Sequence, residues 1–592
     1  MSRLRSATPL LTAVALYLAV AGWQTWAAFS SPVPVILGGG DQPDWTGTLW
    51  TWWWTWEALG QGVSPADGAA NLFPVGLAPV AQFNLVDALA LGWLIDGVGV
   101  TRGYNLAALL LLAGAGLSGR AMCRQLGVAP GAATVAGLLL QCSTTLLIEV
   151  TTGRLSQALI VFGVLGFAGC LRLTGDGARG RDTVLTGILV GLAALTYWYA
   201  ALFIALGALP ALFLRPRNAH RLFGAAGVSA LVCLPAVLAL MSHGDALPGM
   251  TRPIESWMAD ISWTRGRYGL GMAMAHSHQP LWPVVTAPGD PFDKRISPVL
   301  LALAVFGAWK GRSTWRGPLL GAVGVGWLMT LGPWLRSWDG SPVGIPLPWL
   351  LLDAVLPFFD RMWWPERFEL TMLMGLVPLA GLGAAVFVRK PVHGAVLVLA
   401  VLAEQALWQP FHPLPASPPR PFDAALYAEL DGPVITAPVL APFADVRHVL
   451  FMQALHQQPI TGGLGEHLPG HVAPEWTNYV QANPLLDAMA DGAQGPLAAR
   501  TISPGAVDAL LADGLRWVVV DAAICPPGDG PAWTRRDRAL LEAVFGAPDV
   551  RTRGGAAWRI TPIQDSVRLP VLDEPPQLPE SRSFSLQRPE GR

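Results

Sequence analysis

The feature that most constrains this chain is a series of apolar runs, each long enough to cross a lipid bilayer. A spanning helix needs about 20 mostly apolar residues. Of the 592 residues, 52% are hydrophobic and only 13% are charged, against about 25% charged residues in ordinary soluble domains. The sequence therefore predicts an integral membrane protein, whose apolar runs cover residues 9–29, 104–122, 131–150, 156–173, 182–214, 220–241, 296–309, 317–334, 368–388 and 393–409.

The arginines and lysines that flank these runs predict their orientation. The basic clusters fall on one face of the membrane, the cytoplasmic face, only if residues 182–214 form a hairpin of two helices. A single helix of that length would measure about 50 Å. The turn is expected near Thr196–Tyr199. Residues 80–99 are expected to form a re-entrant or interfacial helix, because counting them as a span would reverse every later helix.

The result is about eleven spans in a bacterial inner membrane, with a cytoplasmic N-terminus. The first run is interpreted as an uncleaved anchor, because it is long for the core of a signal peptide cleaved near Ala27–Ala28. Residues 1–410 then form one transmembrane domain with two large outer loops, 30–103 and 242–295, and a shorter one at 335–367.

The last 180 or so residues change character and predict a second domain. A proline-rich entry is followed by short strands and helices, so residues 411–565 are expected to form a small α/β domain outside the cytoplasm. Its clearest elements are buried strands at 434–437 and 515–521 and helices at 504–513 and 535–545. Residues 566–592, rich in Pro, Glu, Ser and Arg, are expected to be disordered.

The net charge and the spacing of the cysteines limit the classes of function that this chain can have. The net charge is −1, whereas nucleic-acid binding calls for a basic stripe or domain. The five cysteines show no CxxC or Cys/His spacing, so neither a zinc site nor a disulfide framework is predicted. The expected partners are membrane lipids and small molecules.

The loop after the first span carries the most distinctive polar residues. Asp41 and Asp44 precede a dense group of tryptophans that includes Trp53 and Trp54. Tryptophan favours the membrane–water boundary, so a carboxylate beside this group suggests chemistry on a lipid-borne substrate. The alternative is that the sequence around the two aspartates is only a polar turn rich in Gly, Pro and Asp.

Five patterns in order resemble the GT-C superfamily of membrane glycosyltransferases, in its uncharacterised bacterial branch related to protein mannosyltransferase-like proteins. The resemblance covers about residues 9–410. The patterns are Asp44 with Trp50, Trp53 and Trp54; residues 71–76 (NLFPVG); Tyr104–Asn105 at the start of a span; residues 187–199 (GILVGLAALTYWY); and residues 331–368, which contain LGP, IPLP and RMWWPERF.

This resemblance implies a mainly α-helical polytopic fold and a transferase activity. A sugar would pass from a polyprenyl-phosphate donor to an envelope acceptor (a glycan, a lipid or a protein) on the outer face of the membrane. A carboxylate in the first outer loop would take the proton of the acceptor hydroxyl, and cations would hold the departing phosphate. Asp44 is the first candidate for this base and Asp41 the second.

The candidate phosphate ligands are Arg361 and Arg367, with Glu366 beside them, because the planar guanidinium group suits phosphate. The alternative is that these arginines anchor the chain at the interface beside neighbouring tryptophans. Further candidates for substrate binding are Arg154, Gln157, Tyr197, Tyr199, Trp53 and Trp54. Two alternatives stay open: Arg154 and the intramembrane Glu149 pair with each other, and the two tyrosines belong to an aromatic belt.

A divalent metal ion stays an open question at this point. Asp339, Asp353 and Asp360 flank the outer face and could share an ion with Asp41 or Asp44. His467 and His471 have a spacing found in metal sites, but Pro469 and Gly470 between them argue against one helical face. No other cofactor is predicted beyond the polyprenyl-phosphate sugar itself as the donor substrate.

Two other function classes compete with the enzyme. A transporter or flippase for a lipid or polyisoprenoid intermediate is disfavoured, because intramembrane charges are few and no pair of interrupted helices recurs in two halves. A non-catalytic scaffold for envelope assembly would act through the exported domain.

Overall fold

A computed structural model of the chain describes residues 2–38, 44–65, 70, 72–76, 85–241, 296–336, 342–356, 359, 362, 365–407, 413–419, 422–437, 439, 446–462, 474–491, 500–524 and 530–569. The chain divides into two compact units. The helical unit comprises Met1–Gln42, Phe83–Ala239 and Thr251–Pro418, and the α/β unit comprises Pro43–Gln82, Leu240–Met250 and Pro419–Arg592. Much of the first outer loop thus belongs with the C-terminal residues, whereas the sequence boundaries had put it in the domain 1–410.

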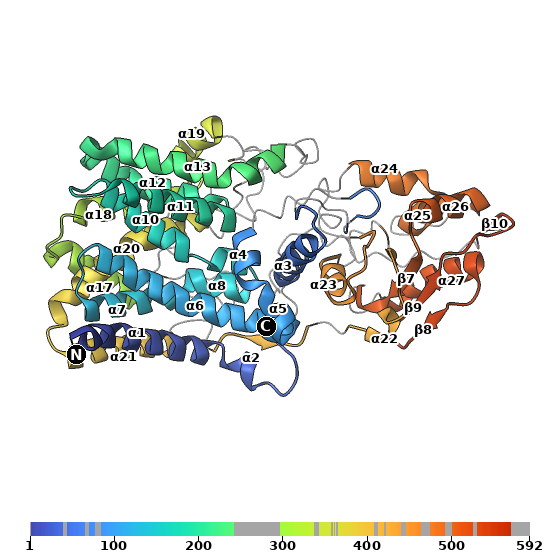
Figure 1. The fold of residues 1–592 in the computed structure, drawn as a ribbon, viewed down its shortest axis with the longest axis horizontal. Helices are drawn as coiled ribbons and strands as arrows, with labels where there is room; N and C mark the ends of the chain where they lie inside the picture. Colours follow the sequence, from blue (N-terminus) through green and yellow to red (C-terminus); the bar gives the residue numbers. More distant parts are fainter. Residues whose placement is uncertain are drawn as a thin grey trace. The chain divides into compact units, whose positions relative to one another are not determined.

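The helical unit consists of apolar helices and two short antiparallel strand pairs (Figure 1). Its strand pairs are β1 (Ile36–Leu37) with β4 (Ala416–Ser417), and β2 (Trp334–Arg336) with β3 (Pro342–Pro346). Its helices are α1 (Ser2–Gln24), α2 (Trp26–Ser30), α4 (Leu85–Leu91), α5 (Trp93–Val98), α6 (Val100–Gln125), α7 (Pro130–Gln141), α8 (Thr144–Thr151), α9 (Leu155–Ala158), α10 (Val161–Leu173), α11 (Gly180–Thr196), α12 (Tyr199–Leu214), η2 (Pro216–Asn218), α13 (Ala219–Met241), α17 (Pro298–Lys310), α18 (Arg316–Thr330), α19 (Pro348–Val355), η6 (Pro365–Phe368), α20 (Glu369–Phe387) and α21 (Pro391–Leu407).

Every apolar run named from the sequence contains a helix, and the break expected near Thr196–Tyr199 is confirmed, because α11 ends at Thr196 and α12 begins at Tyr199. Within the described residues, four helices are long and apolar enough to span a membrane, and the bent pair α7–α8 makes a fifth. Four further apolar helices are shorter. The stretch 80–99 contains α4 and α5, each much too short to span. The number of about eleven spans stays a prediction.

Glycine allows the closest helix contact in this unit. A Cβ atom on Gly307 of α17 would clash with the carbonyl oxygen of Leu379, and one on Gly383 of α20 would clash with that of Leu303. Each glycine thus admits the backbone of the other helix. Small residues at helix crossings are typical of membrane proteins, where van der Waals packing drives association.

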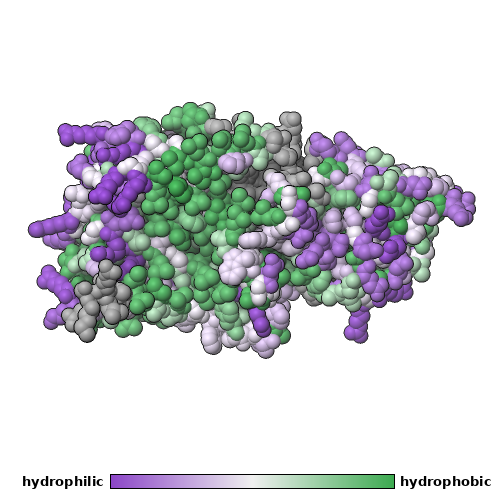
Figure 2. All heavy atoms as spheres, in the orientation of Figure 1, coloured by the Kyte–Doolittle hydropathy of each residue, from purple (hydrophilic) through white to green (hydrophobic). Residues whose placement is uncertain are grey.

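The outer surface of the helical unit is apolar. Large hydrophobic side chains such as Phe223, Leu231 and Leu238 on α13 are more than half exposed. Figure 2 shows hydrophobic (green) side chains gathered across the face of this unit that is in view, with hydrophilic (purple) side chains at its left end. Such a surface is stable in lipid and costly in water.

The α/β unit has a four-stranded mixed sheet in the order β5–β7–β9–β8. β5 and β7 are parallel, and the other neighbours are antiparallel. The predicted strands at 434–437 and 515–521 are confirmed as β5 (Val434–Ala437) and β7 (Trp517–Asp521), and the predicted helices as α26 (Pro504–Ala512) and α27 (Gly530–Phe545). The remaining elements are α3 (Asp44–Gly60), α22 (Ala424–Tyr427), α23 (Val446–His456), α24 (Pro474–Ala482), α25 (Pro484–Asp491), β6 (Thr501–Ile502), η7 (Ala522–Ile524), β8 (Val550–Arg551), β9 (Gly555–Arg559) and β10 (Val567–Arg568).

The tryptophans of α3 form part of the core of this unit. Trp45, Trp50, Trp53 and Trp54 are each less than one tenth exposed. Trp45 packs edge-on against Phe451 of α23 with ring centroids 5.0 Å apart. These side chains thus find partners inside the unit, and the position of the cluster at the membrane–water boundary stays a prediction.

Candidate functional site

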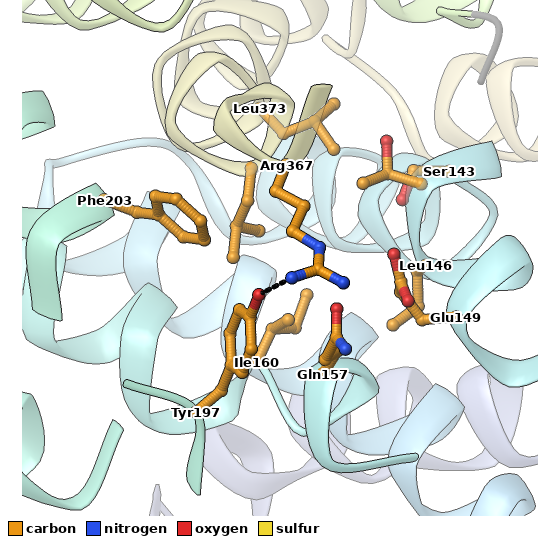
Figure 3. Close-up of a pocket in the computed structure, with 11 residues that line it drawn as sticks. Ser143, Leu146, Glu149, Gln157, Ile160, Tyr197, Phe203, Arg367 and Leu373 are labelled. Atoms are coloured by element: carbon orange, nitrogen blue, oxygen red, sulfur yellow. Dashed lines mark hydrogen bonds between the residues drawn. The ribbon is translucent and has the colours of Figure 1, made fainter. Parts of the chain in front are cut away.

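A pocket opens inside the helical unit, where the break between α7 and α8 faces the junction of α11 and α12 and the turn η6 (Figure 3). Its cavity of about 30 Å³ exceeds the roughly 10–15 Å³ that one water molecule requires. The pocket is lined by Ser143, Thr145, Leu146, Glu149, Gln157, Ile160, Tyr197, Phe203, Arg367, Leu370 and Leu373.

The break in α7–α8 follows from its sequence. Two polar residues and a cysteine (Gln141, Cys142, Ser143) interrupt an otherwise apolar run, and serine is a favoured residue at the N-cap, where the backbone is not helical. Ser143 is extended (φ −68°, ψ 136°), and the two helices meet at a bend of 40°. Irregular backbone at membrane depth is tolerated where it lines a cavity.

An ion pair forms one wall of the pocket. Arg154 Nε donates to Glu149 Oε2 at 2.6 Å, and both side chains are largely buried. Gly153, with φ of 85°, ends the turn between them. The alternative that Glu149 and Arg154 pair with each other is thus confirmed, and their charges compensate.

A second cation lies on the opposite side. Arg367, from η6, donates from Nη1 to the hydroxyl of Tyr197 at 2.5 Å and lies 5.5 Å from the centroid of that ring. Figure 3 shows its guanidinium pointing into the pocket, towards the side chains of Gln157 and Glu149. Arg367, Arg154 and Glu149 together carry a net charge of +1.

Aromatic rings support Arg367 from behind. Tyr197 makes an edge contact with Tyr199 at 5.4 Å, and Phe203 packs edge-on against Phe368, the residue after Arg367, at 4.9 Å. Tyr197 lines the pocket, so its side chain is part of the candidate site. Tyr199 supports it from outside the lining.

The structure brings together part of the predicted site. Arg367, Gln157 and Tyr197 line one pocket, and Arg154 is paired with its Glu149. Asp41, Arg361 and the side chain of Glu366 lie outside the described residues.

Three other predicted residues lie in the α/β unit. Asp44 is partly buried as the first residue of α3. Trp53 and Trp54 pack tilted against each other with centroids 6.0 Å apart. Their candidate roles in the site stay predictions.

Two polar pocket residues were missed by sequence reasoning. Ser143 and Thr145 line the cavity, yet neither belongs to a charged or metal-binding pattern. The available signal was the polar stretch Gln141–Thr145 in the middle of the apolar run 131–150.

In the described part of the chain, no three His, Cys, Asp or Glu side chains come together as metal ligands. Asp339, Asp360, His467 and His471, which the sequence suggested, lie outside the described residues.

No protein-family model and no curated protein matches this chain. Among solved structures, the arabinofuranosyltransferase AftD from Mycobacteria matches with a TM-score of 0.49 and 18% identity over 86% of this chain and 35% of that one. A variant of AftD matches with a TM-score of 0.44 and 18% identity over 86% and 36%. ArnT from Cupriavidus metallidurans, in the apo state, matches with a TM-score of 0.36 and 13% identity over 94% and 98%.

This chain spans about a third of the length of AftD. AftD is a glycosyltransferase by name, the class that the sequence resemblance names. Because the identities are low and no TM-score reaches one half, no residue role passes from these proteins to this chain.

Proposed function

We propose that this protein is a membrane glycosyltransferase that transfers a sugar from a polyprenyl-phosphate donor to an envelope acceptor on the outer face of a bacterial inner membrane. The observation that supports it best is the pocket in which Arg367 points into a cavity between apolar helices. A lipid phosphate needs an apolar surrounding for its chain and a cation for its head group. Arginine, with its planar fork of donors, is well suited to that head group.

In the proposed reaction the acceptor hydroxyl attacks the anomeric carbon of the donor sugar. The bond from that carbon to the phosphate oxygen breaks, and the lipid phosphate leaves with the electron pair. A carboxylate takes the hydroxyl proton. Asp44 is the proposed base, with Asp41 second, and Arg367 with Arg361 would stabilise the charge on the leaving phosphate. A single displacement of this kind inverts the configuration at the anomeric carbon.

Glu149 is the acid that lies in the pocket itself, but its pairing with Arg154 at 2.6 Å makes it a poor base. Its Oε2 already accepts a hydrogen bond from the guanidinium of Arg154. We therefore assign Glu149 to positioning and keep Asp44 as the proton acceptor.

The test is sugar transfer by the purified full-length protein in nanodiscs. Radiolabelled polyprenyl-phosphate sugars and envelope acceptors are offered to wild type, Asp44→Asn and Arg367→Ala. The matched controls are Asp176→Asn and Arg217→Ala, which change exposed residues of the same types. Transfer by wild type and both controls, with a loss of at least about 100-fold in each test variant, supports the proposal.

The competing functions predict other results. Wild type that moves a labelled polyprenyl phosphate across the bilayer without transferring its sugar is a flippase. Wild type that does neither, while deletion of the α/β unit alone gives the envelope phenotype, is a scaffold.

A further inference from the structure

We propose that the N-terminal end of α8, with Ser143 and Thr145, forms together with Arg367 a binding site for the phosphate group of a polyprenyl phosphate. The inference rests on the proposed function for its choice of a lipid as the source of that phosphate. The phosphate chemistry itself follows from the groups that line the pocket.

The first argument is the state of two hydroxyl groups. Ser143 and Thr145 are only 4% and 7% exposed, and within the described residues neither side-chain oxygen has a hydrogen-bond partner. Buried hydroxyls in proteins are almost always paired, and leaving one unpaired costs about 1–3 kcal/mol. Both residues line the pocket, so a ligand there would satisfy them.

The second argument is the helix end on which they lie. Ser143 occupies the N-cap of α8, but its side chain makes no capping hydrogen bond. Serine is favoured at this position because its oxygen normally accepts from an amide of the first turn. The amides of Leu146 and Leu147 donate to the carbonyl of Ser143 at 3.1 Å, so only the amides before them in the helix lack an acceptor within it, and the helix dipole adds partial positive charge there. Such an end is suited to an anion.

The third argument is the charge opposite. The described residues give the guanidinium of Arg367 one hydrogen bond, to Tyr197, although it has five N–H donors. The one acid in the lining, Glu149, is neutralised by Arg154. Because of that pairing the pocket keeps a net positive charge despite its carboxylate.

These groups favour phosphate over a sugar. Hydroxyls, amides and a guanidinium all donate, and a phosphate offers oxygens that only accept. A sugar would find acceptors here as well, in Gln157 and Glu149, but it carries no charge to match the guanidinium of Arg367. The apolar lining residues Leu146, Ile160, Leu370 and Leu373 are suited to the first carbons of a prenyl chain beside it.

The experiment measures binding to the full-length protein in nanodiscs by isothermal titration calorimetry. Three probes are titrated: farnesyl phosphate, farnesol and inorganic phosphate. The variant Ser143→Ala/Thr145→Val removes both hydroxyls with little change in shape. The control Ser118→Ala/Thr174→Val removes two buried hydroxyls that each bond a carbonyl of their own helix. The conservative variant Thr145→Ser keeps a donor.

We expect the double variant to weaken farnesyl phosphate binding by at least about 10-fold, since a hydrogen bond to a charged group contributes more than a tenfold change in affinity. The control and Thr145→Ser should bind as wild type does, and farnesol affinity should not change. Equal affinity of the double variant and wild type for farnesyl phosphate would overturn the site. An equal loss for farnesol would also overturn it, because the effect would then not concern the phosphate.

The remaining outcomes separate this inference from the proposed function. If inorganic phosphate binds as tightly as farnesyl phosphate and loses the same affinity in the double variant, the pocket is an anion site but its ligand is not a lipid phosphate. If wild type binds farnesyl phosphate through these hydroxyls but transfers no sugar, the site stands and the transferase falls. If wild type transfers sugar and the double variant does so with unchanged KM and kcat, the transferase stands and the site falls.

Discussion

Replacing Gln453 by methionine should release α3 from the rest of the α/β unit. The side chain of Gln453 is fully buried and makes three hydrogen bonds. It accepts from Trp50 Nε1 at 2.7 Å and donates to the carbonyl oxygens of Ala70 at 2.6 Å and Gln458 at 3.2 Å. Methionine has a similar length and volume but can replace none of these bonds.

The magnitude follows from the groups left behind. The indole N–H of Trp50 would lose its buried partner, at about 1–3 kcal/mol, whereas the carbonyl of Ala70 keeps a hydrogen bond from the amide of Ile460 at 3.0 Å and would lose only about 0.5–1.5 kcal/mol. Because neighbouring effects do not add fully, we expect about 1.5–4 kcal/mol in total. At 1.4 kcal/mol per tenfold change, this corresponds to roughly 10-fold to several hundred-fold more frequent opening of α3.

Hydrogen exchange of the full-length protein in nanodiscs, read by mass spectrometry on peptides from Asp44–Gly60, measures this opening. The control is Gln61→Met, which removes an exposed hydrogen bond to Glu57 and should cost less than about 0.5 kcal/mol. Trp50→Phe combined with Gln453→Met should cost about 1 kcal/mol less than the two single changes added together. If α3 exchanges no faster in Gln453→Met than in Gln61→Met, these hydrogen bonds do not hold the helix and the reasoning fails.

Three further predictions concern stability. Gly383→Ala should push α17 away from α20 and lower the thermal midpoint of unfolding by several degrees in detergent. The control Gly324→Ala should leave the midpoint unchanged, because a Cβ added there meets nothing within 4 Å. Equal midpoints for the two variants would contradict the close contact. Glu149→Gln should lower the free energy of unfolding by about 1–3 kcal/mol, which is less than the loss expected for a fully buried ion pair, because Arg154 is 15% exposed. Adding Arg154→Met to this variant should restore part of the loss. Thermal melts of wild type and the two variants measure both effects. Burial raises the pKa of Asp537 to about 7, against about 3.9 when unfolded, so wild-type stability should fall as pH rises from about 4 to 7 and then level off. Burial also raises the pKa of Asp521, so Asp537→Asn should reduce that fall between melts at pH 5 and pH 8 without removing it. An unchanged slope in this variant would contradict the assignment to Asp537.

Sequence patterns predicted the parts of the fold that depend on nearby residues. The break at Thr196–Tyr199 followed from helix length and charge, and the strands of the α/β unit from short runs of branched apolar residues. The ion pair between Glu149 and Arg154 could also be predicted from the sequence, because the two residues are five positions apart. In each case the deciding interaction is local.

The rest of the site depends on residues that are distant in sequence. Arg367 and Tyr197 are 170 residues apart, and no periodicity links them. Ser143 and Thr145 carry no charge, so they resemble the many serines and threonines that merely bond their own helix. The partners of the α3 tryptophans could not be predicted either, because an indole ring fits an interface and a core equally well.

The separation of Trp50 and Gln453 in the sequence also determines how long α3 exists during synthesis before its partner α23 is made. These hydrogen-bonded residues are 403 positions apart, and a ribosome adds about 5–20 residues per second. The α3 helix is therefore synthesised about 20 to 80 s before α23 exists to cover it. In that interval the apolar runs of the helical unit are made one after another, while the indole surface of α3 has no native partner in α23. The contacts between α3 and α23 can therefore form only after the chain between them has been made.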